Sequence, residues 1–596
     1  AEAWWILAAD AEAMQQNQSL LELTDLLRAN VDTPDIAATW AWLHGEQAWF
    51  RWRRDQSIAV VPLDEIQRKR KLQKQQRLAE DHNQQQIAVL APSSPLTPER
   101  LETLDPEWRK RLERLVDRAR DDASNLKDDP DVAHWAQVFS LSPDQGSLRQ
   151  WCIQRGLLDP HQPRALHGSV WSGTFAMELE HEAQRLISSA AQPHPGDDDR
   201  LDLCHLATYT LDDAGTREID DAVSLDVQNG EVWIWVHIAD PARLISPGSP
   251  LDQEARRRAT SLYLADGVLP MLPLGLAAGP LSLRAGQRTA AISVSVRLDS
   301  AGAIAERRIA RSWVQPRYGL TYADGDELIE LAPPGDETLA DLSQLMQLRS
   351  RWRRQQGALM FDRMEGRFRR SDGALSLQLV EPSPARLMVS EAMLLMGAVV
   401  AEFGCQHELA LPFRSQPPAE LPSQAELDQL PEGAARDAAI KRCLSRGVQG
   451  TQPMAHFSLG LSAYVQATSP IRRYADLVSH RQIIAQLENT TPLSEPEMGE
   501  LIDDLDDPLR QSIQISREDQ RHWQQVWFSQ YRDQRWDAEF LRFLRPQDGL
   551  ALVHLADLAM DVVGRVDQGN PNPGDRMTMT VKLADPDRGE LQLQLT

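Results

Sequence analysis

Alternation between apolar and polar residues is clearest near the middle of the chain. Every second residue is apolar in residues 223–227, and the alternation resumes in residues 232–238. This pattern is typical of strands, because neighbouring side chains of a strand point to opposite faces. Asn229-Gly230, between the two stretches, is a strong signal for a hairpin turn. The pattern predicts a rigid antiparallel sheet, with the residues that precede it held at its mouth.

The N-terminal third has apolar residues at helical spacing instead. Residues 20–62 favour helices that end in a short strand pair, and residues 63–86 form a polar helical run around KRKLQK. A solvated helix is the simpler interpretation of that run, and an RNA-contacting arm is the alternative. After a linker at residues 92–98, helical spacing continues to residue 189. Within it, SLSPDQGSLRQWCIQRGLLDP is compatible with a helix-turn-helix or winged helix, and equally with ordinary packed helices.

The C-terminal segment returns to short strands. Residues 495–531 favour helix, and alternating strands begin at Trp536 with AEFLRFL, GLALVHL and DVVGRV. The Gly574-Asp575 entry, the strand after it and the DPDRG turn resemble an S-one-type OB barrel that binds RNA.

These patterns predict an α+β fold of several domains, as a length of 596 residues also suggests. The central domain would be a mixed or antiparallel sheet with helices. The predicted divisions are 1–90, a helical or small RNA-binding region; 98–190, helical, with the winged-helix option; 201–490, the central domain; 491–531, a helical connection; and 532–596, the OB-type barrel.

Composition narrows the class of protein. A formal charge of −24 argues against a protein that coats nucleic acid with a basic exterior, although a basic channel inside an acidic shell is compatible with it. Four scattered cysteines suggest free thiols and neither a zinc site nor a disulfide scaffold. We see no apolar run long enough to span a membrane and no secretion signal. We therefore expect a cytoplasmic protein without membrane contact.

Carboxylates are concentrated just before the predicted hairpin, in LDDAGTREIDDAVSLD. Without a cation their charges would repel one another and raise their pKa values. Mg²⁺ favours carboxylate oxygens, and two such ions about 3.5–4 Å apart would suit phosphoryl transfer or nuclease chemistry. A solvated acidic turn is the alternative, and this stretch alone favours that alternative. The carboxylates are Asp212, Asp213, Glu218, Asp220, Asp221 and Asp226.

Further motifs follow in order along the chain, and they favour the metal site over the solvated acidic turn. They are TLDDAGTREIDDAVSLD, HIADPARLISPGSPLDQEARRRATSLYLADGVLPMLP, LSLRAGQRTAAISVSVRLD, GALMF, SEAMLLMG and YVQATSPIRRYADLVSHR. Together they resemble the ribonuclease II family, also called the RNB family. The resemblance covers about half of the chain, and several blocks in order are far stronger evidence than one motif.

The resemblance implies a processive 3′→5′ exoribonuclease that hydrolyses single-stranded RNA with Mg²⁺ and releases nucleoside 5′-monophosphates. One ion or two are compatible with it, and Mn²⁺ is a candidate substitute. By position, Asp220 would support cleavage, and Asp212, Glu218 and Asp221 would hold metal. The family usually has Asp where this chain has Glu218. Either the loop adjusts and Glu218 remains a ligand, or metal binding and activity are weakened.

The resemblance also assigns basic and aromatic side chains. Arg472 would contact the scissile phosphate, where a guanidinium steadies developing charge. Arg473 would line the RNA path or form a structural ion pair, as would Arg481. Tyr263 would stack on a base, with Phe361 as the opposing ring, because every base offers a π-face. Glu391 would bond a ribose hydroxyl and help discriminate RNA from DNA. For each ring, ordinary core packing is the alternative.

Three alternatives to the nuclease remain open from the sequence. The chain is an RNA-binding relative disabled by Glu218, a scaffold whose N-terminal region docks RNA-processing proteins, or a DNA nuclease. Asp220 and Arg472 argue against the first, because a binding protein has no need of them. We expect single-stranded RNA as the partner and no DNA.

Overall fold

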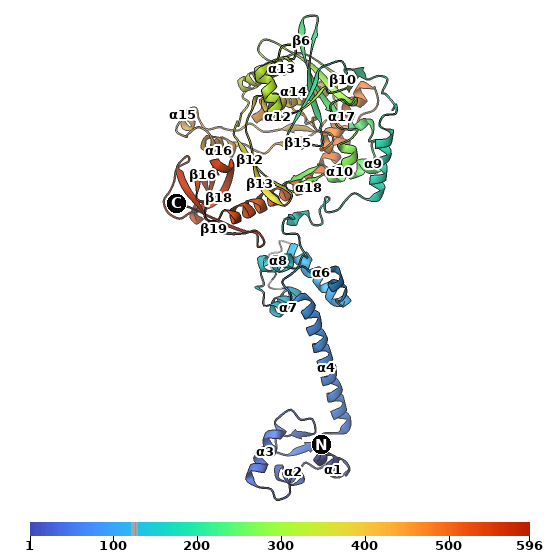
Figure 1. Ribbon diagram of the computed structural model, residues 1–596, viewed down its shortest axis with the longest axis vertical. Coiled ribbons are helices and arrows are strands. Elements are labelled where there is room, and N and C mark those ends of the chain that lie inside the picture. Colours follow the sequence, from blue (N-terminus) through green and yellow to red (C-terminus); the bar gives the residue numbers. More distant parts are fainter. Residues whose placement is uncertain (121–125, 127–128) are drawn as a thin grey trace. The chain divides into compact units, whose positions relative to one another are not determined.

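The computed structural model describes residues 1–120, 126 and 129–596 and has the mixed α and β architecture that the sequence predicts (Figure 1). The contacts divide the chain into two compact units, with the main division between Leu157 and Leu158. Residues 158–190, which the helical pattern grouped with the N-terminal region, belong to the second unit. They are held there by direct bonds, since the Trp171 indole donates to the Thr260 carbonyl at 3.0 Å.

The first unit starts with three helices and the predicted strand pair and continues with helices. Asp129 and Asp144 cap the helices α7 and α8 through their side chains, so each aspartate marks the start of a helix. In the described part of residues 98–190 there is no strand and hence no wing, and the stretch SLSPDQGSLRQWCIQRGLLDP contains one α-helix, α8. The elements are α1 (Glu2–Ala8), α2 (Leu20–Leu27), α3 (Thr33–Leu43), β1 (Phe50–Trp52), β2 (Ile58–Val60), α4 (Leu63–Leu90), α5 (Pro98–Glu102), α6 (Pro106–Arg120), α7 (Pro130–Phe139) and α8 (Gln145–Gln154).

A seven-stranded sheet organises the second unit, in the order β11-β4-β5-β6-β9-β10-β3. The predicted hairpin is confirmed: β5 and β6 pair antiparallel, with Val223 opposite Val236. Asn229 and Gly230 both have positive φ angles, 54° and 81°, as a tight hairpin turn requires. The strands are β3 (Leu201–Asp202), β4 (Thr208–Asp212), β5 (Asp221–Gln228), β6 (Glu231–Ala239), β9 (Thr289–Leu298), β10 (Ile304–Val314) and β11 (Tyr318–Thr321).

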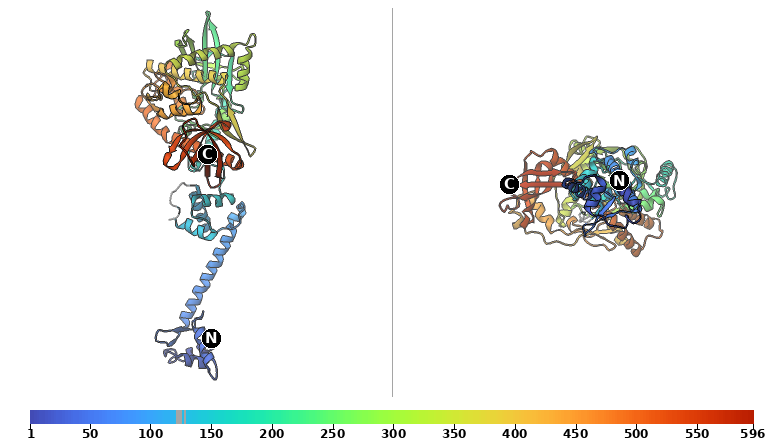
Figure 2. Two further views of the ribbon diagram at one scale, coloured as in Figure 1. Left: turned by 90° about the vertical axis from the view of Figure 1, so that its left-hand side faces the viewer. Right: turned by 90° about the horizontal axis from the view of Figure 1, so that it is seen from below.

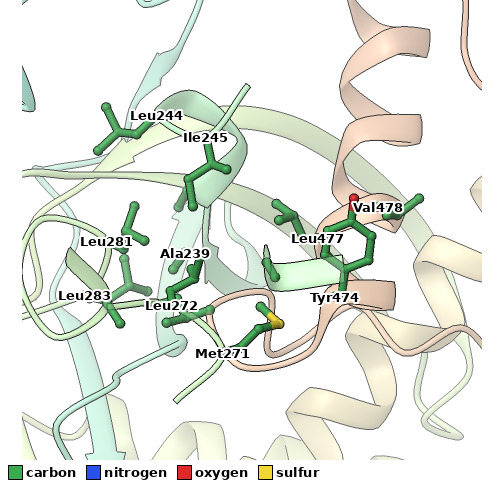
Figure 3. Close-up of a cluster of buried hydrophobic side chains, with 14 of the residues drawn as sticks. Ala239, Leu244, Ile245, Met271, Leu272, Leu281, Leu283, Tyr474, Leu477 and Val478 are labelled. Atoms are coloured by element: carbon green, nitrogen blue, oxygen red, sulfur yellow. The ribbon is translucent and has the colours of Figure 1, made fainter. Parts of the chain in front are cut away.

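Both faces of this sheet are covered. On β6, Ile234, Val236 and Ile238 point into one hydrophobic core, whereas Trp233 and Trp235 point into the other. Figure 3 shows part of the second core, where Ala239 at the end of β6 lies near Leu272 and the core extends to Leu477 of α17. The helices around the sheet are α9 (Met177–Ser189), α10 (Pro250–Arg258), α11 (Leu274–Ala277), α12 (Tyr322–Leu331), α13 (Thr338–Gln355), α14 (Pro384–Gln406), α17 (Tyr474–Leu487) and α18 (Glu495–Gln530).

One helix corrects an expectation from the sequence. Among the described residues, α14 is long and apolar enough to cross a membrane by length and composition, although we had seen no such run. Its most apolar window is 67% buried inside the protein, where Met388, Leu395 and Val399 belong to the core on one side of the sheet. Burial on the inside of the fold accounts for its composition.

Five strands at the C-terminus close into a barrel, drawn in red in Figure 1 and in both views of Figure 2. Its core includes Phe540 and Val553 and also Trp523 and Phe528 of α18, so that helix and barrel share one hydrophobic cluster. The strands are β16 (Trp536–Arg545), β17 (Leu550–Leu555), β18 (Met560–Val566), β19 (Arg576–Asp585) and β20 (Glu590–Leu595).

Three two-stranded sheets complete the described part of the second unit. They are β7 (Leu262–Leu264) with β8 (Gly267–Leu269), β12 (Glu365–Ser371) with β13 (Ala374–Val380), and β14 (Phe413–Ser415) with β15 (Val448–Gly450). Two helices, α15 (Gln424–Leu427) and α16 (Ala434–Cys443), lie between β14 and β15 in sequence.

Candidate functional site

A cavity of about 1630 Å³ in the second unit contains the acidic stretch. Its wall comes from the loop between β4 and β5, the hairpins β7–β8 and β12–β13, α18 and the barrel. Although the chain is acidic as a whole, many cations line this wall, and they include Arg363, Arg367, Arg369, Arg370, Arg386 and Lys441. A cavity lined by so many cations suits an anionic polymer whose end would lie at the cluster of carboxylates.

The pairing of β4 with β5 gathers the carboxylates. Asp212 is the last residue of β4 and Asp221 the first of β5, and because these strands are antiparallel neighbours, the two residues lie at the same edge of the sheet. Asp220 immediately precedes β5, and Glu218 lies in the intervening loop. All four line the cavity, so the structure brings together the acidic residues that the sequence singled out.

Burial and mutual repulsion raise the pKa values of these carboxyl groups. Burial, with repulsion from Asp220, raises the pKa of Asp212 to about 6. Burial also raises the pKa of Asp220 to about 6, against the attraction of Arg472. The pKa of Asp221 rises to about 7, mainly through burial and then through the charges of Asp212 and Asp220. A cation at this edge would relieve the repulsion.

Asp220 is held by a turn that follows far later in the chain. One of its oxygens accepts the Ile471 backbone N–H at 2.9 Å, and the other accepts Arg472 Nε at 3.2 Å. The Asp220 side chain is 2% exposed and that of Arg472 is 37% exposed, so the guanidinium still faces the cavity. The turn itself is anchored by Asp476, whose Oδ2 accepts the backbone N–H groups of Thr468 and Ser469, each at 2.9 Å.

Tyr263 of β7 bonds to the acidic loop. Its hydroxyl donates to Glu218 Oε2 at 2.8 Å, whereas Glu218 Oε1 is buried and has no hydrogen-bond partner. The Tyr263 ring is 43% exposed, and the Arg472 guanidinium lies 6.0 Å from its centroid. Phe361, the second predicted ring, also lines the cavity, with Lys441 Nζ 4.6 Å from its centroid. Both rings are therefore placed where a base could stack.

Two predicted residues are not part of the cavity wall. Glu391 is 1% exposed on α14, and both of its oxygens accept hydrogen bonds from Arg353 of α13. Its carboxylate therefore serves the packing of two helices and is not available to a ribose. Arg473 points to the turn instead, where it donates to Asp476 and to Thr468. Of the two interpretations left open for Arg473, the structure has the ion pair; Arg481 likewise pairs with Asp252 at 2.7 Å.

The cavity also contains residues that the sequence did not reveal. Tyr322, at the start of α12, lies on the wall, with the Arg386 guanidinium 4.0 Å from its ring centroid. Arg386 in turn pairs with Asp213, one of the two carboxylates of the acidic stretch that had no assigned role. Spacing along the chain contains no signal for Tyr322. The run Arg367 to Arg370 was visible as a basic patch, but its place in the cavity depends on the β12–β13 hairpin.

The carboxylates fit an open magnesium site better than a closed one. Among the described residues, no group of three or more His, Cys, Asp or Glu side chains is positioned to enclose a metal ion. Mg²⁺ does not need such a cage, since it is commonly held by one or two carboxylates together with waters and substrate phosphates. The charge of Asp212 raises the pKa of Asp221 across the strand edge, and these two residues are the fitting pair of donors.

Comparisons with known proteins point to one family. Residues 200–489 match the RNB domain. An uncharacterized ribonuclease of Synechocystis is 39% identical over 445 residues, which are 74% of this chain and 66% of that protein. The chloroplastic and mitochondrial ribonuclease II of Arabidopsis thaliana is 36% identical over 65% of this chain and 49% of its own length. The chain thus spans between about half and two thirds of the length of these relatives.

Solved structures share the fold at low sequence identity. Mycoplasma genitalium RNase R in complex with ribose-methylated single-stranded RNA has a TM-score of 0.63 and 18% identity, over 71% of this chain and 76% of that one. Yeast Ssd1, a pseudonuclease, has a TM-score of 0.51 and 16% identity, over 65% of this chain and 55% of its own. The fold is therefore found in a protein with RNA bound and in one described as a pseudonuclease.

Proposed function

Because the chain belongs to the RNB family, we propose that it is a processive 3′→5′ exoribonuclease that hydrolyses single-stranded RNA with Mg²⁺ and releases nucleoside 5′-monophosphates. The observation that carries this proposal is the contact between Asp220 and Arg472 at the carboxylate end of the cavity. A protein that only binds RNA has no use for a buried carboxylate held against a partly exposed guanidinium.

Each step of the reaction has a side chain suited to it. Arg472 binds an oxygen of the last phosphodiester and stabilises the negative charge that the phosphoryl oxygens carry in the transition state. Asp220, fixed by the Ile471 N–H and by Arg472, orients the attacking water. Water adds to phosphorus, the 3′ oxygen of the preceding nucleotide leaves and takes up a proton, and a nucleoside 5′-monophosphate is released. Asp212 and Asp221 would hold magnesium, which when bound neutralises phosphate charge and activates water.

Selection of single strands follows from the walls of the same cavity. Tyr263 and Phe361 offer rings to the terminal bases, and stacking is indifferent to sequence. Arg367 and Arg369 of β12 face the path of the phosphates. The closed five-stranded barrel at the C-terminus supports the proposal of an OB-type RNA-binding module, which would keep contact with the strand between cuts. The N-terminal region remains a candidate docking site for RNA-processing proteins.

The test uses a 5′-labelled single-stranded RNA with Mg²⁺, beside a DNA of the same sequence and the variant Asp220→Asn. We expect a ladder that shortens from the 3′ end to a small remnant, absent on DNA and in the variant. Tight binding of RNA without shortening, in Mg²⁺ and in Mn²⁺, would refute the nuclease and leave an RNA-binding relative. Shortening of the DNA at a similar rate would refute the RNA specificity.

A further inference from the structure

We propose that Glu218 is a positioning residue for Tyr263 and not a ligand of the metal. The proposal deepens the function given above and rests on it, because it assigns to Glu218 the task of holding the ring on which a terminal base stacks. It replaces the sequence-based expectation of a third metal-binding carboxylate at this position.

The hydrogen bond between the two side chains is the first support. Glu218 is 7% exposed, and its Oε2 accepts the Tyr263 hydroxyl at 2.8 Å. The Tyr263 ring remains 43% exposed on the cavity wall. A rigid, buried acceptor at the tip of an exposed ring fixes the ring plane, so less conformational freedom is lost when a base stacks on it.

The backbone immediately after Glu218 is clamped, which limits how far its carboxylate can move. The Ser282 hydroxyl accepts the Ile219 N–H at 3.0 Å and is itself fixed, because it donates to the Ala277 carbonyl at 2.8 Å. The Leu283 N–H donates to the Ile219 carbonyl at 3.0 Å. The loop is thus tied to residues 282–283 immediately after Glu218, whose side chain bonds to Tyr263.

The position of Glu218 in the fold separates it from the expected metal pair. Asp212 ends β4 and Asp221 begins β5, whereas Glu218 lies in the loop between these strands and accepts the Tyr263 hydroxyl. Arg472 lies on the Tyr263 side as well, 6.0 Å from the ring centroid. Glu218 and Arg472 therefore flank the tyrosine, one at its hydroxyl and the other at its ring, while Asp212 and Asp221 form a separate pair at the strand edge.

Three variants distinguish the two roles. Glu218→Gln removes the charge but keeps an oxygen that accepts the tyrosine hydroxyl. Glu218→Ala removes both, and Tyr263→Phe removes only the hydroxyl. We would measure RNA affinity by fluorescence anisotropy in chelator, so that metal plays no part, and Mg²⁺ affinity by calorimetry without RNA. Asp221→Asn serves as the positive control for loss of metal binding, and thermal unfolding checks that each variant is folded.

The proposal expects Glu218→Ala and Tyr263→Phe each to weaken RNA binding about 5-fold, the size of a typical hydrogen-bond contribution. The double variant should be no weaker than either single one, because both remove the same bond. Glu218→Gln should retain RNA affinity and Mg²⁺ affinity within about 2-fold, whereas Asp221→Asn should lose about 10-fold or more in Mg²⁺ affinity.

Either of two results would overturn it. A loss of Mg²⁺ affinity in Glu218→Gln as large as in Asp221→Asn would make Glu218 a metal ligand. Additive losses of RNA affinity in the double variant would show that Glu218 and Tyr263 act independently. Both measurements are made without catalysis, so failure of the wild-type chain to shorten RNA would refute the nuclease alone and would leave this comparison intact.

Discussion

Asp476 Oδ2 accepts the Ser469 backbone N–H at 2.9 Å and thereby anchors the turn that presents Arg472 to the Asp220 carboxylate. The same oxygen also accepts Thr468 N–H at 2.9 Å and Arg473 Nη2 at 2.7 Å. A single charged atom thus holds both ends of the turn. Asp476 is fully buried and does not line the cavity, so any effect on the proposed reaction would come only through the residues that it positions.

Asp476→Asn should lower kcat by about 100-fold, because a displacement of about 1 Å at reacting groups is enough for such a loss. RNA affinity in chelator should change less than about 2-fold. The effects of Asp476→Asn and Arg472→Lys on kcat should be far from additive in the double variant, since both substitutions disturb the same turn. The matched control is Asp507→Asn, at an exposed position on α18. Additive effects on kcat would show that Asp476 does not act through Arg472.

The stability of the metal-free protein should depend on pH through Asp221. Its pKa is raised to about 7, whereas an aspartate in the unfolded chain titrates near about 4. The folded chain therefore binds this proton more tightly, so the group stabilises the fold below about pH 4 and loses that effect as pH rises through about 7. Asp221→Asn, which cannot ionise, should raise Tm relative to wild type at about pH 8 and leave it unchanged at about pH 4.

This comparison is made by thermal unfolding in chelator. Asp212 and Asp220, with pKa values of about 6, should add to the same trend in the wild type. Mg²⁺ should raise the Tm of the wild type at the higher pH, because bound cation replaces the proton. A Tm gain from Asp221→Asn that is larger at low pH would contradict the assigned direction of the shift.

Removal of the Tyr263 ring should weaken RNA binding without regard to sequence. Tyr263→Ala is expected to cost about 1–3 kcal/mol in binding free energy, the usual range for one stacked base. The same loss should appear with oligomers of each of the bases, and Phe361→Ala should behave in the same way. Tyr531→Ala is the control, since that ring is 40% exposed but outside the cavity. Sequence-selective loss would argue for base-edge recognition instead.

Glu391→Ala should affect stability and not the choice between RNA and DNA. Glu391 and Arg353 have side chains 1% and 3% exposed, and loss of one partner of such a pair costs about 3–5 kcal/mol. Glu402→Ala on the same helix is the control. It removes an ion pair with Arg307 at 3.0 Å, but the Glu402 side chain is 51% exposed, so the loss should lower the free energy of unfolding by at most about 1 kcal/mol. Urea unfolding measures both, and a loss of RNA preference with unchanged stability would restore the ribose contact.

Features that depend on neighbours along the chain were predictable. The hairpin of β5 and β6 follows from alternation and from Asn229-Gly230, which tolerates positive φ. Membership of the RNB family was visible in the order of the motifs, and Asp212, Glu218, Asp220 and Asp221, which line the cavity, lie in the stretch that was singled out. The grouping of residues 158–190 was not predictable, because helical spacing does not say which unit a helix packs against.

The sequence by itself determined the carboxylates, their spacing and the strands that follow them, since turn conformations and side-chain alternation depend on residues close together in the chain. Only the tertiary structure decided which side chains contact one another. Asp220 meets Arg472 across 252 residues, Tyr263 bonds to Glu218, and Glu391 turns to Arg353 instead of the cavity. The physical reason is that periodicity specifies which face of an element is buried, whereas the atoms that face one another there depend on how distant elements pack.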